Sequence, residues 1–441
     1  MEREWWQSLV HVCRRWRSLV FGSPRRLHLR LCCTNTTPVL DTLDVWPPFP
    51  FVILGSTRLT EDVNNVVAAL ERRDRVDEIH LYQVEKVLPA MQEPFPELTF
   101  LQLESYDKSV PVVPDSLLGG SAPLGGSAQS LRYLVLNGIP FPGLPKLLLS
   151  TTNLVVLDLS NIPHSGYISP DTLVTALSTL ISLGSLSLHF QSPRSYLDQA
   201  NRHLHPLTRT VLPALTRFFF KGVHEYLDDL VAGIDAPQLI NLELAFFNDI
   251  VFDAPQLIQF INRTPTLSAV DKTHVAIGHD RGIVNSLSQT SRYKVVVLCS
   301  ELDWQLSSLE QVCTSCLPPL STTEDLYIYQ DPYLQAHWKD NTENLLWPEL
   351  LHPFTTVKNL YLSKEFMRRI MPALQDLDGG RTTEVLPTLQ NIFLEEVEPG
   401  GRVQEDIGRF VAARQLSGHT ITVSHWERDP IREWIWLLLG R

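Results

Sequence analysis

The chain has 441 residues, of which 44% are hydrophobic and 20% charged, a composition typical of a soluble folded protein and unlike that of a disordered one. Its formal net charge of −12 disfavours a general role in nucleic-acid binding, and its longest apolar runs fall far short of the ~20 residues of a membrane-spanning helix. Six cysteines in so long a chain do not make a disulfide framework, so we expect a reducing compartment, the cytoplasm or the nucleus.

The first predicted element is a helix over residues 5–20. Apolar side chains recur there at helical spacing with arginines between them, and Gly22 and Pro24 end the pattern. On periodicity alone, residues 1–23 form a helical cap that covers the open end of whatever structure follows.

The same segment resembles the second half of an F-box. The core pattern Val-Cys-x-x-Trp-x-x-Leu is matched by Val12, Cys13, Trp16 and Leu19, and the first ~55 residues are similar to the F-box proteins of mushroom-forming fungi. This resemblance implies that residues 1–23 are an F-box remnant and that they contact a Skp-type adaptor. The adaptor-binding residues that it implies are Trp5, Leu9, Val12, Cys13, Trp16 and Leu19.

The resemblance is incomplete at its start. F-boxes of this group open with a helix of the type Leu-Pro-x-Glu-Ile/Val-Leu, and residues 1–5 do not match it. Either the start of the protein lies upstream and the F-box is truncated here, or the chain has lost strong docking to the adaptor. Both interpretations stay open at this point.

A six-residue pattern repeats along the rest of the chain, with apolar residues at its first, fourth and sixth positions. Clear copies begin at Val76, Leu98, Leu131, Leu154, Leu183, Leu215, Leu239, Val357 and Leu389, and weaker ones at Pro24, Phe49, Leu267, Tyr293, Thr323 and Gly418. The mean spacing is about 28 residues, which is typical of leucine-rich repeats. Residues 24–441 are therefore predicted to form an α/β leucine-rich-repeat-like solenoid, with a curved parallel sheet and helices on its convex side.

Helices are expected between the strands. Thr60 with Glu61 and Asp62 has the features of a helix start, and Ser169 followed by Pro170 has them too. Further helices are predicted over residues 253–262, 364–374 and 403–416. Two polar or glycine-rich stretches, residues 109–130 and 189–206, are predicted to be loops.

The third and fifth positions of each hexad should point away from the core, because side chains alternate along a strand. Exposed aromatic and arginine side chains on such a face are common anchors for a protein partner. We predict partner-binding residues at Tyr133, Arg217, Phe219 and Tyr361, the alternative being an ordinary solenoid surface.

No catalytic, metal or cofactor site is predicted. Cys313 and Cys316 lack the second ligand pair of a zinc site, and His203 and His205 have no nearby third ligand. Nucleotide-binding and hydrolase motifs are also missing from the sequence. We expect a protein that binds rather than an enzyme.

The chain end is apolar, with Trp426 followed by residues 434–439, and is predicted to cap the last repeat, the alternative being contact with a membrane or a partner. The function predicted for the whole chain is that of a substrate-recognition subunit of a Skp–cullin–F-box ubiquitin ligase, which rests on the resemblance. The alternative is a leucine-rich-repeat scaffold that binds a protein partner with no ligase link. The sequence does not name the target.

Overall fold

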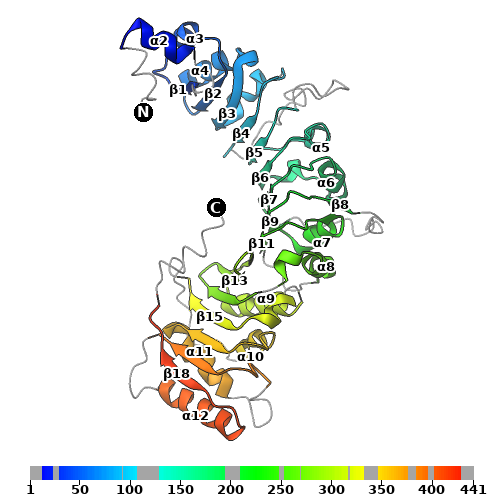
Figure 1. The fold of residues 1–441 in the computed structure, drawn as a ribbon, viewed down its shortest axis with the longest axis vertical. Helices are drawn as coiled ribbons and strands as arrows, with labels where there is room; N and C mark the ends of the chain where they lie inside the picture. Colours follow the sequence, from blue (N-terminus) through cyan, green and yellow to red (C-terminus); the bar gives the residue numbers. More distant parts are fainter. Residues whose placement is uncertain are drawn as a thin grey trace. The chain divides into compact units, whose positions relative to one another are not determined.

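The computed structural model describes the chain in eleven segments, which are residues 12–22, 29–91, 93–106, 129–193, 209–247, 253–268, 270–315, 318–331, 346–375, 384–395 and 402–428. The chain divides into two compact units, unit 1 with residues 1–191 and unit 2 with residues 192–441. Both are built from strands that alternate with helices along the chain (Figure 1).

Unit 1 is a parallel sheet whose strands follow one another in chain order. Its elements are α2 (Arg14–Phe21), β1 (Leu29–Cys33), α3 (Val39–Val45), β2 (Phe51–Ser56), α4 (Thr60–Leu70), β3 (Val76–Tyr82), β4 (Phe100–Glu104), β5 (Tyr133–Asn137), α5 (Leu144–Leu148), β6 (Val156–Ile162), α6 (Pro170–Leu177) and β7 (Ser185–Phe190). Short 3-10 helices lie at Arg73–Arg75, Val84–Lys86, Leu88–Ala90 and His164–Gly166. Each strand from β1 to β7 pairs in parallel with the next, as a repeat array requires.

Unit 2 has a longer sheet in the order β9-β11-β14-β13-β12-β15-β16-β17-β18. Its elements are β8 (Thr210–Val211), β9 (Arg217–Gly222), α7 (His224–Ala232), β10 (Ile234–Asp235), β11 (Asn241–Phe247), α8 (Pro255–Arg263), β12 (Lys272–Ile277), β13 (Arg281–Leu287), β14 (Arg292–Leu298), α9 (Leu302–Ser315), β15 (Asp325–Gln330), α10 (Leu346–Leu351), β16 (Asn359–Leu362), α11 (Lys364–Gln375), β17 (Asn391–Leu394), α12 (Arg402–Leu416) and β18 (Thr422–His425). Two 3-10 helices lie at Pro265–Leu267 and Pro318–Thr322. Strands β8 and β10 form a separate parallel pair.

Strand β13 departs from the predicted all-parallel arrangement. It pairs antiparallel with both β12 and β14. The connections on either side of it are short turns, closed by hydrogen bonds from the Gly278 amide to the Arg281 carbonyl (2.8 Å) and from the Ser288 amide to the Ser291 carbonyl (2.9 Å). Turns of this length cannot hold a crossover helix, so the chain must reverse direction.

The nine clear hexads all fall in strands with the expected register. Their fourth and sixth positions are buried, as in Leu134 and Leu136 of β5 or Phe218 and Phe220 of β9. Most weak copies are wrong in register. Tyr293, for example, was predicted as the first position of a hexad. It pairs with Leu242, which is a fourth position, so Tyr293 is itself a fourth position and its hexad begins three residues earlier. Among the weak copies, the one that begins at Thr323 has the register that the hexad predicts.

The helices predicted between the strands are confirmed with shifts of a few residues at their ends. Of the helix predicted over residues 5–20, residues 5–11 lie outside the described residues, and α2 begins at Arg14. Ser169 is the N-cap of α6, and its Oγ accepts a hydrogen bond from the Thr172 amide (3.3 Å). Thr60, in contrast, is the first residue of α4, and the N-cap position is held by Leu59. The helices bury apolar side chains against one face of the sheet in each unit, such as Val66 and Leu70 of α4. We call the opposite face, on which the third and fifth hexad positions lie, the open face (Figure 1).

Threonines that lie a few residues or less before a hexad link successive repeats. The Oγ1 atoms of Thr356 and Thr388 donate to the carbonyls of Thr323 and Val357 (both 3.0 Å), and Thr266 donates in the same way to Leu239. In every case the acceptor is the first residue of the preceding hexad. One side chain thereby satisfies a main-chain group that the strand ladder leaves unpaired.

Candidate partner-binding surface

One row of residues crosses the open face of unit 2 from strand to strand. Its members are opposite one another in the strand pairing, and they are Phe219, Glu243, Lys294, Asn285, His274, Tyr327, Tyr361, Phe393 and Ser424. The row begins with an aromatic residue, continues with charged and polar residues, and then becomes aromatic again over β12 to β17.

The aromatic half of this row forms a stacked ladder. Ring centroids are 4.4 Å apart between His274 and Tyr327, 4.2 Å between Tyr327 and Tyr361, and 4.5 Å between Tyr361 and Phe393. The rings are nearly parallel, at 6° to 10°. Neighbouring strands lie ~4.8 Å apart, so aromatic residues at one register position of parallel strands stack as a direct result of the pairing.

Trp426 lies beside this ladder, directly after β18. Its ring is at 5.9 Å from that of Tyr327 and, in an edge-to-face arrangement, at 5.6 Å from that of Tyr361. The guanidinium of Arg428 lies over Tyr329 at 4.7 Å, and its Nη2 donates to the Gln330 carbonyl (2.9 Å). The end of the described chain thus adds both an aromatic ring and a cation to the open face.

The polar half of the row is held by an ion pair and a side-chain hydrogen bond. Lys294 Nζ lies 2.7 Å from Glu243 Oε1, and Arg292 Nε donates to Asn285 Oδ1 (3.1 Å). Burial lowers the pKa values of Lys294 and Arg292, partly offset by the Glu243 carboxylate. Burial, with Lys272 and Arg292 nearby, lowers the pKa of His274 to about 3, so its ring is neutral at pH 7.

The open face of unit 1 has a different character. His80 contacts Glu78 through Nε2 (3.0 Å) and Gln102 through Nδ1 (3.1 Å), and Gln102 donates to Glu104 (2.6 Å). Phe100 stacks between His80 and Tyr133, with centroid distances of 4.4 Å and 5.4 Å. Carboxylates therefore dominate the charge on this face, whereas lysine and arginine are numerous on that of unit 2.

The four predicted partner-binding residues all lie on open faces, one of them in unit 1 and three in unit 2. Tyr133 belongs to unit 1 and is 37% exposed. Arg217 is exposed and Phe219 half-buried on β9, whereas Tyr361 is in the middle of the aromatic ladder. Their role in binding stays a prediction.

Of the ladder, only Tyr361 was among the predicted partner-binding residues. His274, Tyr327 and Phe393 were not, and the position of Trp426 beside the ladder was not predicted either. Tyr327 and Phe393 occupy the fifth position of their hexads, as Tyr361 does, so alignment of the repeats could have found them. His274 could not be found in this way, because the weak hexad at Leu267 had the wrong register.

The predicted adaptor-binding residues that the structure describes are exposed. Val12 is 63%, Trp16 45% and Leu19 62% exposed, and Cys13 is exposed as well. Trp5 and Leu9 lie outside the described residues. Both the cap and the F-box remnant over residues 1–23 stay predictions.

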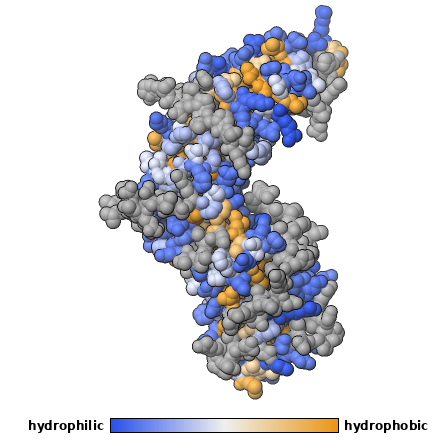
Figure 2. Space-filling model, turned by 180° about the vertical axis from the view of Figure 1, so that it is seen from behind, coloured by the Kyte–Doolittle hydropathy of each residue, from blue (hydrophilic) through white to orange (hydrophobic). Residues whose placement is uncertain are grey.

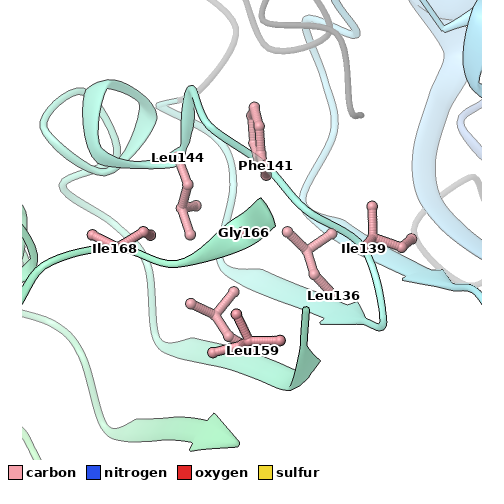
Figure 3. Close-up of a pocket in the computed structure, with 8 residues that line it drawn as sticks. Leu136, Ile139, Phe141, Leu144, Leu159, Gly166 and Ile168 are labelled. Atoms are coloured by element: carbon pink, nitrogen blue, oxygen red, sulfur yellow. The ribbon is translucent and has the colours of Figure 1, made fainter. Parts of the chain in front are cut away.

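The described part of the chain has few other features that could form a ligand or metal site. A cavity of about 20 Å³ lies under α5 in unit 1, lined by side chains such as Leu136, Phe141 and Leu159 (Figure 3), and has room for about one water molecule. Cys313 is buried in α9, and Cys316, His203, His205 and residues 434–439 lie outside the described part of the chain. Within that part, His, Cys, Asp and Glu side chains form no group of three suited to a metal ion.

Apolar side chains at the surface are interspersed with hydrophilic ones on the side seen in Figure 2. Among the helices of the described residues, none is long and apolar enough to cross a membrane. The chain thus has two surfaces of interest, the exposed apolar side chains at α2 and the open faces of the repeat sheet.

Comparison with known proteins identifies no family. No model of a protein family matches the chain, and no curated protein matches it. Among solved structures, it is similar to the leucine-rich repeat-containing protein LegL7 from Legionella pneumophila, with 13% sequence identity, a TM-score of 0.32, and coverage of 89% of this chain and 98% of that one. The repeats and the strand pairing described above show a leucine-rich-repeat-like solenoid fold.

Proposed function

We propose that the chain is the substrate-recognition subunit of a Skp–cullin–F-box type ubiquitin ligase, in which the region of α2 contacts a Skp-type adaptor and an open face binds the target protein. The observation that carries the proposal is the exposure of Val12, Trp16 and Leu19. Apolar side chains that share one short segment and remain in solvent are a common mark of a protein interface. Their match to the F-box core supports the adaptor as the partner.

The repeat fold supports the second half of the proposal. Stacked repeats present an extended surface, and the fold suggests a scaffold that binds protein. Arg217 and Phe219 on β9 are the anchors that we favour, because aromatic and arginine side chains contribute most to many interfaces. We propose binding without catalysis or cofactor, in the cytoplasm or the nucleus.

Co-purification of the chain with a recombinant Skp-type adaptor tests the proposal. The test variant is Val12→Asp combined with Leu19→Asp, which introduces charge at two exposed apolar positions. The matched control is Ile181→Asp combined with Leu416→Asp, since these side chains are 63% and 90% exposed and lie elsewhere on the chain. The wild type and the control should retain the adaptor, and the test variant should bind at least ~10-fold more weakly, because a buried unpaired charge costs more than 1.4 kcal/mol.

A wild-type chain that does not bind the adaptor, or a test variant that binds it as the control does, would overturn the ligase assignment. The function would then be that of a repeat scaffold with no ligase link. A protein captured by the wild type and lost in Phe219→Ala would still support binding by the open face.

A further inference from the structure

The open face of unit 2 is buried where the strands β14, β13, β12 and β15 lie side by side. Val296, Ile283, Ala276 and Tyr329 are opposite one another in the strand pairing, and they are 6%, 5%, 0% and 1% exposed. They form one apolar cluster, which we call the face cluster. Their neighbours along the strands, such as Val297, point to the opposite face and are also buried. Both faces of the sheet are therefore covered here.

The same position of the repeat is far more exposed in unit 1. Tyr82 of β3 and Tyr329 of β15 are both the seventh residue counted from the start of their hexads. Tyr82 is 40% exposed, and the residues in the same row on β4, β5 and β6, which are Glu104, Asn137 and Ser160, are half-buried. Neighbours in the sheet thus leave a side chain of this row partly in solvent. The burial of Tyr329 requires a group that lies above the sheet.

The described neighbours of the face cluster account for part of this cover. The partly buried apolar side chains packed against it come from strands of the same sheet, so they lie beside it. The guanidinium of Arg428 lies above Tyr329, 4.7 Å from the ring centroid, and covers one edge of the cluster. Strands β13 and β14 are second and third from β15, at distances of ~10 and ~14 Å. A further segment is needed above these two strands.

The described chain leads onto this face after β18. The Trp426 amide donates to the Leu394 carbonyl at the end of β17 (2.8 Å), and the Trp426 ring is 5.6 Å from that of Tyr361 on β16. Two residues later, Arg428 Nη2 donates to the Gln330 carbonyl at the end of β15 (2.9 Å). The contacts thus move from β17 over β16 to β15, in the direction of β12 and β13.

We propose that residues 429–441, which follow Arg428, lie on the open face of unit 2 and cover the face cluster. Positions 434–439 read Trp-Ile-Trp-Leu-Leu-Leu, and such a run is favourably placed against an apolar face. Residues 429–433 span up to ~17 Å when extended, which is enough to bring the run from β15 to β14. The segment then covers a face of the sheet, whereas a cap would cover the end of the last repeat.

This arrangement has a consequence for target binding, although the inference goes beyond the proposed function and does not depend on the adaptor. A target that binds over β12 to β15 must first displace residues 429–441. Arg217 and Phe219 on β9 lie outside the covered strands. The segment therefore limits a target to the remaining part of the open face or competes with it.

Photo-crosslinking in the full chain tests the position of the segment. The photoreactive residue p-benzoylphenylalanine is incorporated in place of Trp436, the protein is irradiated, and the cross-linked peptides are identified by mass spectrometry. The matched control carries the same group in place of Leu416, which is 90% exposed in α12. Position 436 should become joined to residues of β12 to β15 in the same molecule, and position 416 should not.

Hydroxyl-radical footprinting measures the cover of the face cluster, with Tyr82 as the internal reference. In the wild type, Tyr82 should be oxidised several-fold faster than Tyr329, in line with their exposure. Trp434→Ser combined with Trp436→Ser should raise the oxidation of Tyr329 at least ~3-fold and leave Tyr82 unchanged, because loss of two indoles weakens an apolar contact. The control Leu416→Ser should leave both tyrosines unchanged.

Three results would overturn the proposal. Cross-links from position 436 that reach only α12, β17 or β18, or none at all, would remove the segment from the face cluster. Cross-links between two molecules would assign the cover to a second copy of the chain. Unchanged oxidation of Tyr329 in the double-serine variant would assign it to other residues, such as 332–345. If that variant does not fold, the cross-links decide alone, and adaptor binding with its loss in the Val12/Leu19 variant remains a separate measurement.

Discussion

At the scale of single residues, His274 makes a stabilising aromatic contact but also buries a polar ring nitrogen, which is unfavourable. Its ring stacks on Tyr327, while its Nδ1 is buried and has no hydrogen-bond partner in the part of the chain that the structure describes. Sequence alone gives no reason to place a histidine in such an environment, because a lone histidine on a strand is usually half-exposed. The environment comes from β13, whose antiparallel insertion places Asn285 opposite His274.

His274 should make the stability of the chain depend on pH. Burial lowers its pKa to about 3 in the folded state, against ~6.5 for histidine in an unfolded chain. Between these two pKa values only the unfolded chain takes up the proton, which stabilises the unfolded state. The stabilising contribution of the neutral His274 ring is therefore complete above pH ~6.5 and is lost as the pH falls toward 3. The free energy of unfolding should decrease by up to ~1.4 kcal/mol per pH unit from this group alone. Urea titrations of the wild type and of His274→Gln between pH 7 and pH 4 measure the difference in slope.

Equal slopes for the two proteins would contradict this prediction. NMR offers a direct measurement, because the ring protons of His274 should not titrate above pH 5 in the folded protein. The experiment requires selective histidine labelling, and the spectrum of His274→Gln identifies the resonance by its loss.

At the scale of elements, the start of α8 depends on a residue of the preceding helix. The N-cap position of α8 is Ala254, which has no side-chain acceptor. Asp228 of α7 takes its place, since Oδ1 accepts from the amides of Gln256 (2.8 Å) and Leu257 (2.9 Å). A carboxylate at a helix N-terminus also interacts favourably with the helix dipole.

Asp228→Ala should therefore lower the free energy of unfolding of unit 2 by ~1–2 kcal/mol, in the range of a lost N-cap. Asp228→Asn is the matched control, because its amide oxygen can still accept from both groups and should restore most of the loss. Chemical denaturation with hydrogen exchange at α8 measures both effects. A variant Asp228→Ala as stable as the wild type would show that water replaces the cap at no cost.

The register of a strand could be predicted from the sequence where apolar and polar residues alternate in only one way. Leu134 and Leu136 have polar or half-exposed neighbours, so the hexad has one register, and the structure confirms it. In β14, Val295, Val296 and Val297 follow one another and are all buried, so alternation cannot select the face. Links such as Asp228 to α8, or Thr356 to the preceding repeat, join residues about 30 positions apart, and no local pattern shows them.

The candidate site was predictable only in part for the same reason. Tyr361 was identified because its hexad is clear, and Phe393 shares its position in the next repeat. The polar half of the row was not predictable, because it depends on β13 lying between β12 and β14, which were predicted from the sequence as consecutive repeats. The antiparallel insertion thus limited both the fold and the site prediction.

At the scale of the whole molecule, stability should be local. In a repeat array each strand and helix contacts only its neighbours, so there is no single core that couples all residues. Most inter-repeat contacts described for both units are of this kind, the exception being Trp426 and Arg428, which reach from the end of β18 to β15. Each unit has its own buried apolar side chains. A substitution in one unit should therefore destabilise its own repeats first.

Leu134→Ala in unit 1 and Leu360→Ala in unit 2 test this expectation as a matched pair. Both leucines are fully buried at the fourth position of their hexads, so each substitution should cost ~2–5 kcal/mol in its surroundings. Hydrogen exchange followed by mass spectrometry should show faster exchange in β4 to β6 for Leu134→Ala and in β15 to β17 for Leu360→Ala, with little change in the other unit. Faster exchange throughout the chain in either variant would mean that unfolding is a single cooperative event, because loss of one repeat would then remove the support of all the others.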